Sequence, residues 1–129
     1  MHYTRTSTIA LIEDDRVLSD AIYTGLTDAG FTVERAFDGE SGLAMVLSKK
    51  PSLVLLDILM PKMDGLAVAE KIKNNPETKK IPVIILTVLE NAKPVAKALD
   101  LGVYEYFIKS DFKVDDIVNR VKEHFNESN

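Results

Sequence analysis

No cysteine occurs among the 129 residues of this chain. Its absence excludes disulfide bonds and metal sites built on thiolates, and it is typical of proteins from a reducing compartment. The sequence also lacks an apolar run long enough to cross a membrane, and it does not open with the basic and apolar segments of a signal peptide. We therefore expect a cytoplasmic protein without a membrane segment.

Basic runs, repeats and linkers are missing as well. The net charge is −4 and no basic cluster stands out along the chain, which argues against direct binding of nucleic acid. No internal repeat or low-complexity segment divides the sequence. A content of 46% hydrophobic and 28% charged residues is that of an ordinary globular protein. The length and composition together predict one domain over residues 1–129.

Short apolar runs alternate with stretches of helical periodicity. The runs at residues 53–56 and 83–86 are wholly apolar, as in strands covered on both faces, whereas residues 32–36 alternate like an edge strand. Five strands alternating with five helices predict a doubly wound α/β fold. The expected strands lie at 9–12, 32–36, 53–56, 83–86 and 104–108, and the expected helices at 18–29, 38–50, 64–75, 92–99 and 114–125.

The expected helices have predicted inward faces, and in the last one this face consists of Val114, Ile117, Val118, Val121 and Phe125. In the first, Ala21 belongs to the stripe that also contains Ile22 and Leu26. In the second, Leu43, Val46 and Leu47 are expected to point inward.

Polar and charged side chains follow four of the expected strands. Asp57 comes directly after a buried apolar run, which is an unusual place for a charge. In open parallel sheets the carboxyl ends of the strands share one edge, and ligands bind there. We therefore expect these residues to converge on one rim: Glu13, Asp14 and Asp15 after the first strand, Asp57 after the third, Thr87 after the fourth and Lys109 after the fifth.

Crowded carboxylates repel one another, so such a rim requires a cation or a bound proton. All-oxygen ligands without histidine or cysteine favour Mg²⁺ over zinc. An aspartate nucleophile, a metal ion, a cation and a hydroxyl donor are the parts of a phosphoryl-transfer site. Taken singly, Asp15 is explained as a helix cap, Thr87 as a strand-end residue and Lys109 as a surface charge. The agreement of four strand ends favours the functional interpretation.

The segments LIEDD, LVLLDILMPKMDG, VIILT and YFIKS resemble the receiver domain of two-component response regulators, in order and in spacing. The resemblance covers nearly the whole chain. It implies a flavodoxin-like fold, with a five-stranded parallel sheet in the order 2-1-3-4-5 and five helices. It also implies one receiver domain, either standing alone or cut from the front of a longer regulator.

The resemblance assigns chemical roles to the site. It implies that Asp57 accepts a phosphoryl group from the phosphohistidine of a sensor histidine kinase or a phosphotransfer protein. Mg²⁺ would be bound by Asp14 and Asp57 directly, by Glu13 through water, and by the main-chain carbonyl of Leu59. Such a domain is not an enzyme acting on other molecules, because it catalyses only its own phosphorylation and dephosphorylation.

The remaining roles concern the response to the phosphoryl group. By resemblance, Thr87 and Lys109 would bind phosphoryl oxygens, and Tyr106 would be the switch aromatic that turns inward as Thr87 moves. A core aromatic is the alternative interpretation of Tyr106. The surface of the fourth helix, fifth strand and fifth helix would then change. An output domain or a downstream protein would read that change, and a dimer through this surface is compatible with the resemblance.

Several positions depart from the family pattern. Ser110 follows Lys109 where proline is usual, and a non-proline cis bond costs roughly 3–4 kcal/mol, so we expect a trans peptide. Val88 stands where a small residue is usual, and its branches would crowd the phosphoryl group. Leu59 and Leu89 replace polar residues that help fast-hydrolysing relatives to position water. We hypothesise that both leucines shield the acyl phosphate and lengthen its lifetime.

Three other functions compete with this interpretation. A pseudo-receiver would keep the fold as a protein-binding module without using phosphate, and Val88 and Ser110 favour it. A phosphatase of the haloacid-dehalogenase type would require Asp-x-Asp after the first strand, whereas EDDR stands there. A flavin carrier of the flavodoxin type would require a phosphate loop rich in Ser, Thr and Gly at that position.

Overall fold

Strands and helices alternate along the chain in the computed structural model. It describes residues 7–58, 60, 64–87, 96–97, 99–103, 105–108 and 113–127. The strands are β1 Thr8–Ile12, β2 Thr32–Ala36, β3 Leu53–Asp57, β4 Val83–Thr87 and β5 Glu105–Ile108. The helices are α1 Arg16–Asp28, α2 Gly39–Lys49, α3 Gly65–Lys73 and α5 Val114–Glu127.

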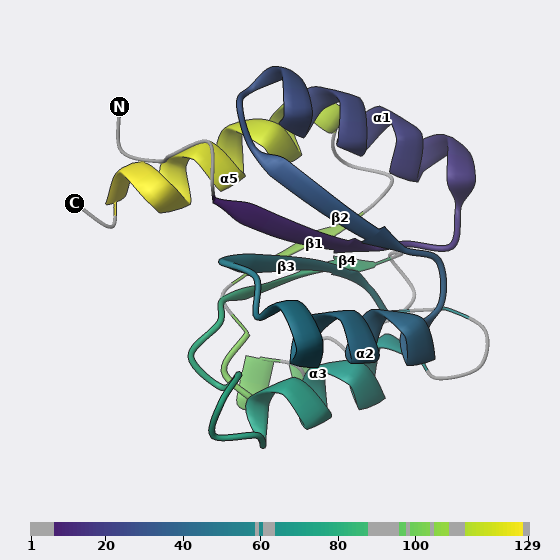
Figure 1. Ribbon diagram of the computed structural model, residues 1–129, viewed down its shortest axis with the longest axis vertical. Helices are drawn as coiled ribbons and strands as arrows, with labels where there is room; N and C mark the ends of the chain where they lie inside the picture. Colours follow the sequence, from purple (N-terminus) through teal and green to yellow (C-terminus); the bar gives the residue numbers. More distant parts are fainter. Residues whose placement is uncertain are drawn as a thin grey trace.

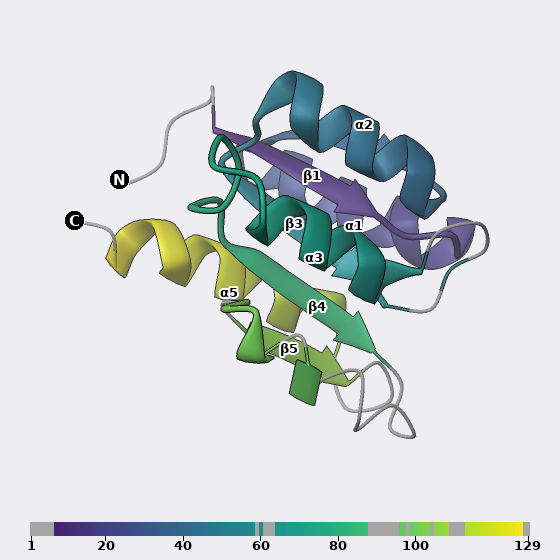
Figure 2. The same cartoon turned by 90° about the horizontal axis from the view of Figure 1, so that it is seen from below.

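The strands form one parallel sheet in the order β2-β1-β3-β4-β5. Figure 2 shows β1, β4 and β5 pointing the same way, so their carboxyl ends share one edge of the sheet. Strand β2 lies at one margin, which agrees with its alternating sequence. The predicted doubly wound α/β fold with a parallel sheet is confirmed.

Helices cover both faces of the sheet, with α1 and α5 on one side and α2 and α3 on the other (Figure 1). Each face has its own apolar core, and β1 contributes to both because successive side chains alternate. Ile9 and Leu11 join the core under α1 and α5, while Ala10 and Ile12 join the core above α2 and α3. Burial on both faces explains why the central strands are continuous apolar runs.

An aspartate begins three of the helices. The carboxylates of Asp15, Asp38 and Asp64 accept hydrogen bonds from backbone N–H groups in the first turn of α1, α2 and α3, at 3.1, 2.8 and 2.9 Å. These bonds satisfy donors that have no partner within the helix. At the other end of α2, Lys50 adopts a left-handed conformation with φ 46° and ends the helix before Pro51.

Two side chains that we expected to face inward are exposed. Ala21 lies on the solvent side of α1, and Leu47 on α2 is 38% exposed. Gly42 approaches the sheet instead, and a Cβ there would lie 2.7 Å from the Ile12 side chain. Val46 is buried and Leu43 packs against the core as expected, so of the predicted stripe of α2 only Leu47 lies outside the covered face. The helix expected at 92–99 falls largely outside the described residues.

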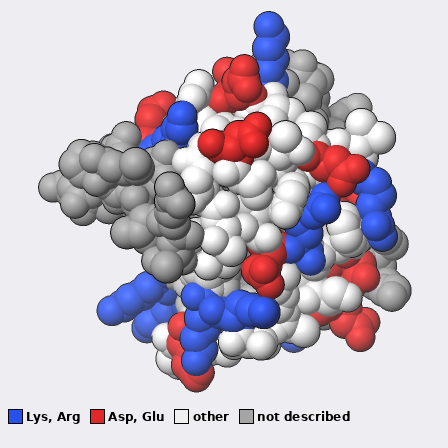
Figure 3. All heavy atoms as spheres, turned by 45° about the horizontal axis from the view of Figure 1, so that its top comes forward, with Lys and Arg blue, Asp and Glu red and all other residues white. Residues whose placement is uncertain are grey.

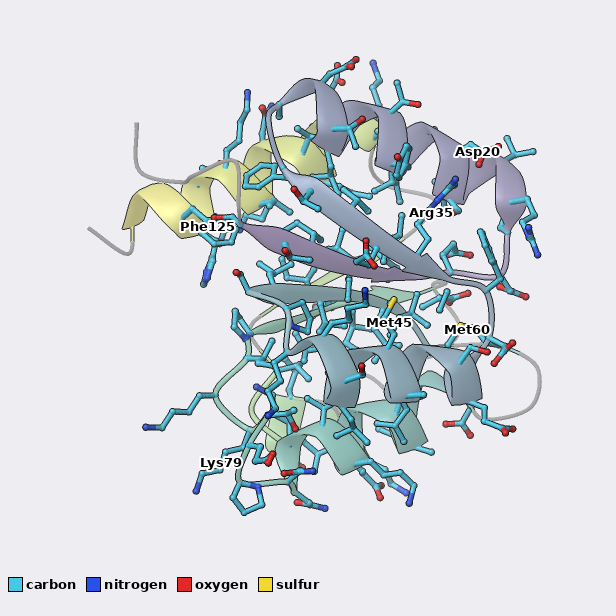
Figure 4. All side chains as sticks on the ribbon, viewed as in Figure 1. Asp20, Arg35, Met45, Met60, Lys79 and Phe125 are labelled. Atoms are coloured by element: carbon cyan, nitrogen blue, oxygen red, sulfur yellow. The ribbon has the colours of Figure 1, made fainter. Side chains whose placement is uncertain are left out.

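Charges are mixed on the face shown in Figure 3, where acidic and basic side chains are interspersed. Ion pairs join some of them, such as Arg35 with Asp20 at 2.6 Å and Lys49 with Glu34 at 3.2 Å. Figure 4 shows Arg35 and Asp20 approaching each other from β2 and α1. Within the described ranges, no helix has the length and apolar character needed to span a membrane.

Candidate functional site

Three carboxylates meet where β1 and β3 end. Ile12 pairs with Leu56 across these adjacent strands, so Glu13 and Asp14 leave β1 beside Asp57 at the end of β3. Carboxylate oxygens of the three residues lie within 4.8 Å of one another. The structure therefore brings together residues that are separated by more than forty positions in the sequence.

The three side chains differ in exposure. Glu13 is fully buried and Asp57 is 2% exposed, whereas Asp14 faces solvent. Backbone bonds fix the turn that carries them, since Glu13 N–H donates to the Ala36 carbonyl at 3.1 Å. Asp15 N–H donates to Oε1 of Glu13, also at 3.1 Å. Asp14 is thus the member of the acidic cluster that solvent reaches, while Glu13 and Asp57 lie beneath the surface.

The donor set suits a hard divalent cation. Its ligands are oxygens on two neighbouring strand ends, and among the residues that the structure describes no imidazole or thiolate accompanies them. Bringing like charges together and burying them is costly unless a cation compensates. Glu13, Asp14 and Asp57 therefore fit Mg²⁺, while Leu59, the expected carbonyl ligand, lies outside the described residues.

Gly65 packs against the main chain of Asp57 and Ile58. This first residue of α3 donates its N–H to the Ile58 carbonyl at 2.8 Å. A Cβ on Gly65 would lie 2.2 Å from the Asp57 carbonyl oxygen and 2.4 Å from Cα of Ile58. On its other side, Ile58 N–H donates to the Leu86 carbonyl at 3.0 Å. The main chain beneath Asp57 is therefore held between β4 and the start of α3.

The structure describes only some of the other predicted site residues. Thr87 ends β4 beside β3, because Asp57 pairs with Leu86, but only its backbone is described. Tyr106 lies on β5 opposite Ile85 and is 40% exposed, so the alternative of a core aromatic is wrong. Four further residues of the prediction fall outside the described part of the chain: Val88, Leu89, Lys109 and Ser110.

The sequence analysis missed two features of this rim. One is the contact of Gly65 with the Asp57 main chain, for which the Asp-Gly pair at 64–65 was the available signal. The other is the Arg16 guanidinium, whose carbon lies 3.5 Å from the ring centroid of Phe37. No pattern in the sequence indicated that second contact, because the two residues belong to different elements.

Comparison with known proteins identifies the family. Residues 9–122 match the response regulator receiver domain. Because this match spans most of the chain, the protein belongs to the receiver-domain family of response regulators.

Individual relatives agree with that assignment. The chain is 34% identical over 114 residues to the DNA-binding dual master transcriptional regulator RpaA of a Synechocystis species. It is 36% identical over 115 residues to the transcriptional regulatory protein DltR of Streptococcus agalactiae. Each match covers 88% of this chain but only 47% and 50% of those proteins. The chain thus spans about half the length of the curated relatives it matches.

Solved structures show the same fold. A CheY-like response regulator receiver domain protein from Methanospirillum hungatei has a TM-score of 0.86 at 25% identity, with 95% of both chains covered. The signal receiver domain of a histidine kinase from Syntrophus aciditrophicus has a TM-score of 0.84 at 27% identity. That match covers 95% of this chain and 92% of the other.

Proposed function

We propose that this chain is the phospho-accepting domain of a two-component system and that Asp57 is the residue phosphorylated. The observation that carries the proposal is the meeting of Glu13, Asp14 and Asp57 at the carboxyl edge of a rigid parallel sheet. Membership of the receiver family supports it. The donor would be the phosphohistidine of a histidine kinase or of a phosphotransfer protein.

The transfer step forms one bond and breaks another. A carboxylate oxygen of Asp57 attacks phosphorus and forms an O–P bond, while the P–N bond to the donor histidine breaks. The electron pair of that bond stays with the imidazole nitrogen, which then takes a proton from solvent. A buried strand end suits the nucleophile, because it holds the attacking oxygen in one position and no loop motion has to bring it into place.

The residues around Asp57 have separate tasks in this proposal. Glu13 and Asp14, with the carbonyl of Leu59, would hold Mg²⁺ beside Asp57. When bound, the ion neutralises charge on the phosphoryl oxygens as the acyl phosphate forms. Thr87 and Lys109 would bind the remaining phosphoryl oxygens.

Phosphorylation would act by shifting a population of conformers. The added charge at Asp57 favours the arrangement in which Thr87 and Lys109 contact it. Tyr106, exposed in the unmodified protein, would then turn inward and alter the surface around β5. An output domain or downstream protein would read this surface, which would also serve for dimerisation.

The proposal also covers the domain organisation of the chain and its location in the cell. Residues 1–129 would be one receiver domain that acts on no other substrate and catalyses only its own phosphorylation and dephosphorylation. A cytoplasmic location, where a kinase would present its phosphohistidine, belongs to the same proposal.

The test is incubation with acetyl phosphate and Mg²⁺, followed by intact-mass measurement over time. We expect a phosphoryl mass shift in the wild type and none in Asp57→Asn or in the presence of EDTA. Removing the donor and following the decay of the shift tests the shielding ascribed to Leu59 and Leu89. A phosphate lost within seconds, or a lifetime unchanged in Leu89→Glu, would contradict that hypothesis.

A pseudo-receiver is the second candidate, and Val88 and Ser110 are the residues that favour it. It predicts neither a mass shift nor Mg²⁺ binding. Mg²⁺ binding without a mass shift would instead indicate a site too crowded for acetyl phosphate, with Val88→Ala as the first variant to test.

A further inference from the structure

Arg16 occupies the margin of the acidic site on the side of β2. It is the first residue of α1, two positions after Asp14, and its guanidinium stacks on the ring of Phe37. Phe37 follows Ala36, the residue whose carbonyl accepts the Glu13 N–H. Arg16 and Phe37 therefore follow the two segments that this backbone hydrogen bond joins at the end of β1.

Acidic residues directly precede Arg16 in the chain. Asp14 belongs to the acidic cluster, and the Asp15 carboxylate caps α1 by accepting a hydrogen bond from the N–H of Leu18. Among the described residues, no carboxylate forms an ion pair with Arg16.

Arg35 provides an internal comparison. Its guanidinium lies 4.3 Å from the Tyr23 ring centroid and 5.6 Å from that of Phe37, but it also pairs with Asp20 at 2.6 Å. The charge of Arg35 is therefore already compensated, and its contacts help to hold Phe37 in place. Stacking on Phe37 uses one face of the Arg16 guanidinium and leaves its N–H edge available for an anion.

We propose that Arg16 binds the phosphate group of the incoming phosphodonor at the entrance of the site. This inference rests on the proposed function, because it names a contact made by the donor before transfer to Asp57. A guanidinium matches two phosphate oxygens with paired hydrogen bonds, and Arg16 stands two residues after Asp14, whose carboxylate belongs to the acidic cluster. It would offset the repulsion that the three carboxylates exert on an anionic donor.

Acetyl phosphate serves as the probe, and the rate constant of phosphorylation is measured by intact mass at limiting donor concentration. We expect Arg16→Ala to lower this rate constant by about fivefold to tenfold, as for loss of one charge-assisted hydrogen bond. Arg16→Lys keeps the charge but loses the planar guanidinium. Its rate constant should lie between those of the wild type and Arg16→Ala. Phe37→Leu keeps the arginine but removes its support, so it should lower the rate constant in the same direction.

Two further measurements separate this role from a structural one. Arg120→Ala removes the same charge from α5 and should phosphorylate at the wild-type rate. After donor removal, Arg16→Ala should lose its phosphoryl group at the wild-type rate, because the contact belongs to the donor complex only. A slower phosphorylation with unchanged decay is not expected from a variant that is merely less well folded.

Three results would overturn the inference. Equal phosphorylation rates in Arg16→Ala and wild type would show that no donor contact exists. An equal loss in Arg120→Ala would show that only net charge matters. If the wild type itself takes up no phosphoryl group, the proposed function fails and the inference fails with it, whereas the first two results leave the proposed function intact.

Discussion

Gly65 determines how closely α3 can approach the acceptor residue. The Cα of Gly65 lies so close to the main chain of Asp57 and Ile58 that no room is left for a side chain on it. This contact and the pairing with β4 hold the main chain of Asp57, from which its side chain extends. A single residue outside the acidic cluster thus controls its geometry.

Gly65→Ala is expected to displace the Asp57 main chain, because the new methyl carbon would lie 2.2 Å from a backbone oxygen. We expect a loss of about 1–3 kcal/mol in the free energy of unfolding, as for other overpacked sites. The rate of phosphorylation by acetyl phosphate should fall on the order of 10²-fold if Asp57 moves by about 1 Å. Urea unfolding and intact-mass kinetics measure the two effects.

Gly42→Ala is the matched control for this prediction. Its added carbon would lie 2.7 Å from the buried side chain of Ile12, so this substitution also crowds the core, but the atoms nearest to it belong to a side chain and not to the main chain of Asp57. The substitution also gains helix propensity, worth up to about 1 kcal/mol. We expect Gly42→Ala to phosphorylate normally, and equal defects in the two variants would refute the role given to Gly65.

At the scale of elements, the connection from α3 to β4 is held by a lysine. Nζ of Lys73 donates hydrogen bonds to the carbonyls of Ile81 and Lys79, at 2.7 and 3.1 Å. Burial lowers the pKa of Lys73 below its ordinary value, because partial removal from water disfavours the ammonium form. The side chain therefore ties the last turn of α3 to the residues that lead into β4.

Lys73→Met should lower the free energy of unfolding at neutral pH by about 1 kcal/mol, since two carbonyls lose their donor. The sign of the pH effect follows from the lowered pKa. Between the folded and the ordinary pKa the unfolded chain binds more protons, so the wild type gains stability as pH rises through that window. The variant lacks this gain.

The stability difference between wild type and Lys73→Met should therefore widen at alkaline pH. Denaturant unfolding at neutral pH and just below the ordinary lysine pKa measures it. Lys71→Met, an exposed lysine on the same helix, is the control and should show no such widening. A stability difference between wild type and Lys73→Met that shrinks with rising pH would contradict the lowered pKa of Lys73.

At the scale of the whole molecule, folding brings together carboxylates whose mutual repulsion destabilises the folded state. Glu13, Asp14 and Asp57 repel one another wherever the sheet forms, so a bound cation should stabilise the entire domain. This coupling links occupancy of the site to the free energy of unfolding.

Mg²⁺ should raise the unfolding temperature of the wild type. At a hundredfold excess over its dissociation constant the gain is about 2.7 kcal/mol, which amounts to several degrees for a domain of this size. Asp14→Asn should be more stable than wild type in EDTA, because one repelling charge is gone, and should respond little to Mg²⁺. Thermal unfolding followed by circular dichroism measures both effects.

Glu70→Gln removes one negative charge from the exposed side of α3 and should keep the full response to Mg²⁺. Unfolding temperatures that are the same in EDTA and in Mg²⁺ for the wild type would exclude a cation site in the acidic cluster.

Much of the fold could be predicted from local patterns. The apolar runs at Leu53–Asp57 and Val83–Thr87 are strands because they are buried on both faces, and Asp15, Asp38 and Asp64 begin helices because their carboxylates cap free N–H groups. The buried position of Val46 on α2 also agrees with its periodicity, but the exposure of Leu47 was not predicted. Gly42 lies against Ile12 on the covered face of α2, and a residue without a side chain does not register in helical periodicity.

The sequence alone determined which side chains follow each strand, and therefore that Glu13, Asp14 and Asp57 would stand at strand ends. Their expected convergence on one rim is confirmed, but only the tertiary structure decided how closely they approach, that Gly65 lies against Asp57, and that Arg16 stacks on Phe37. The physical reason is the range of each interaction. Turns, caps and periodicity act over a few residues, whereas distances between strand ends depend on strand order, register and the packing of helices on the sheet.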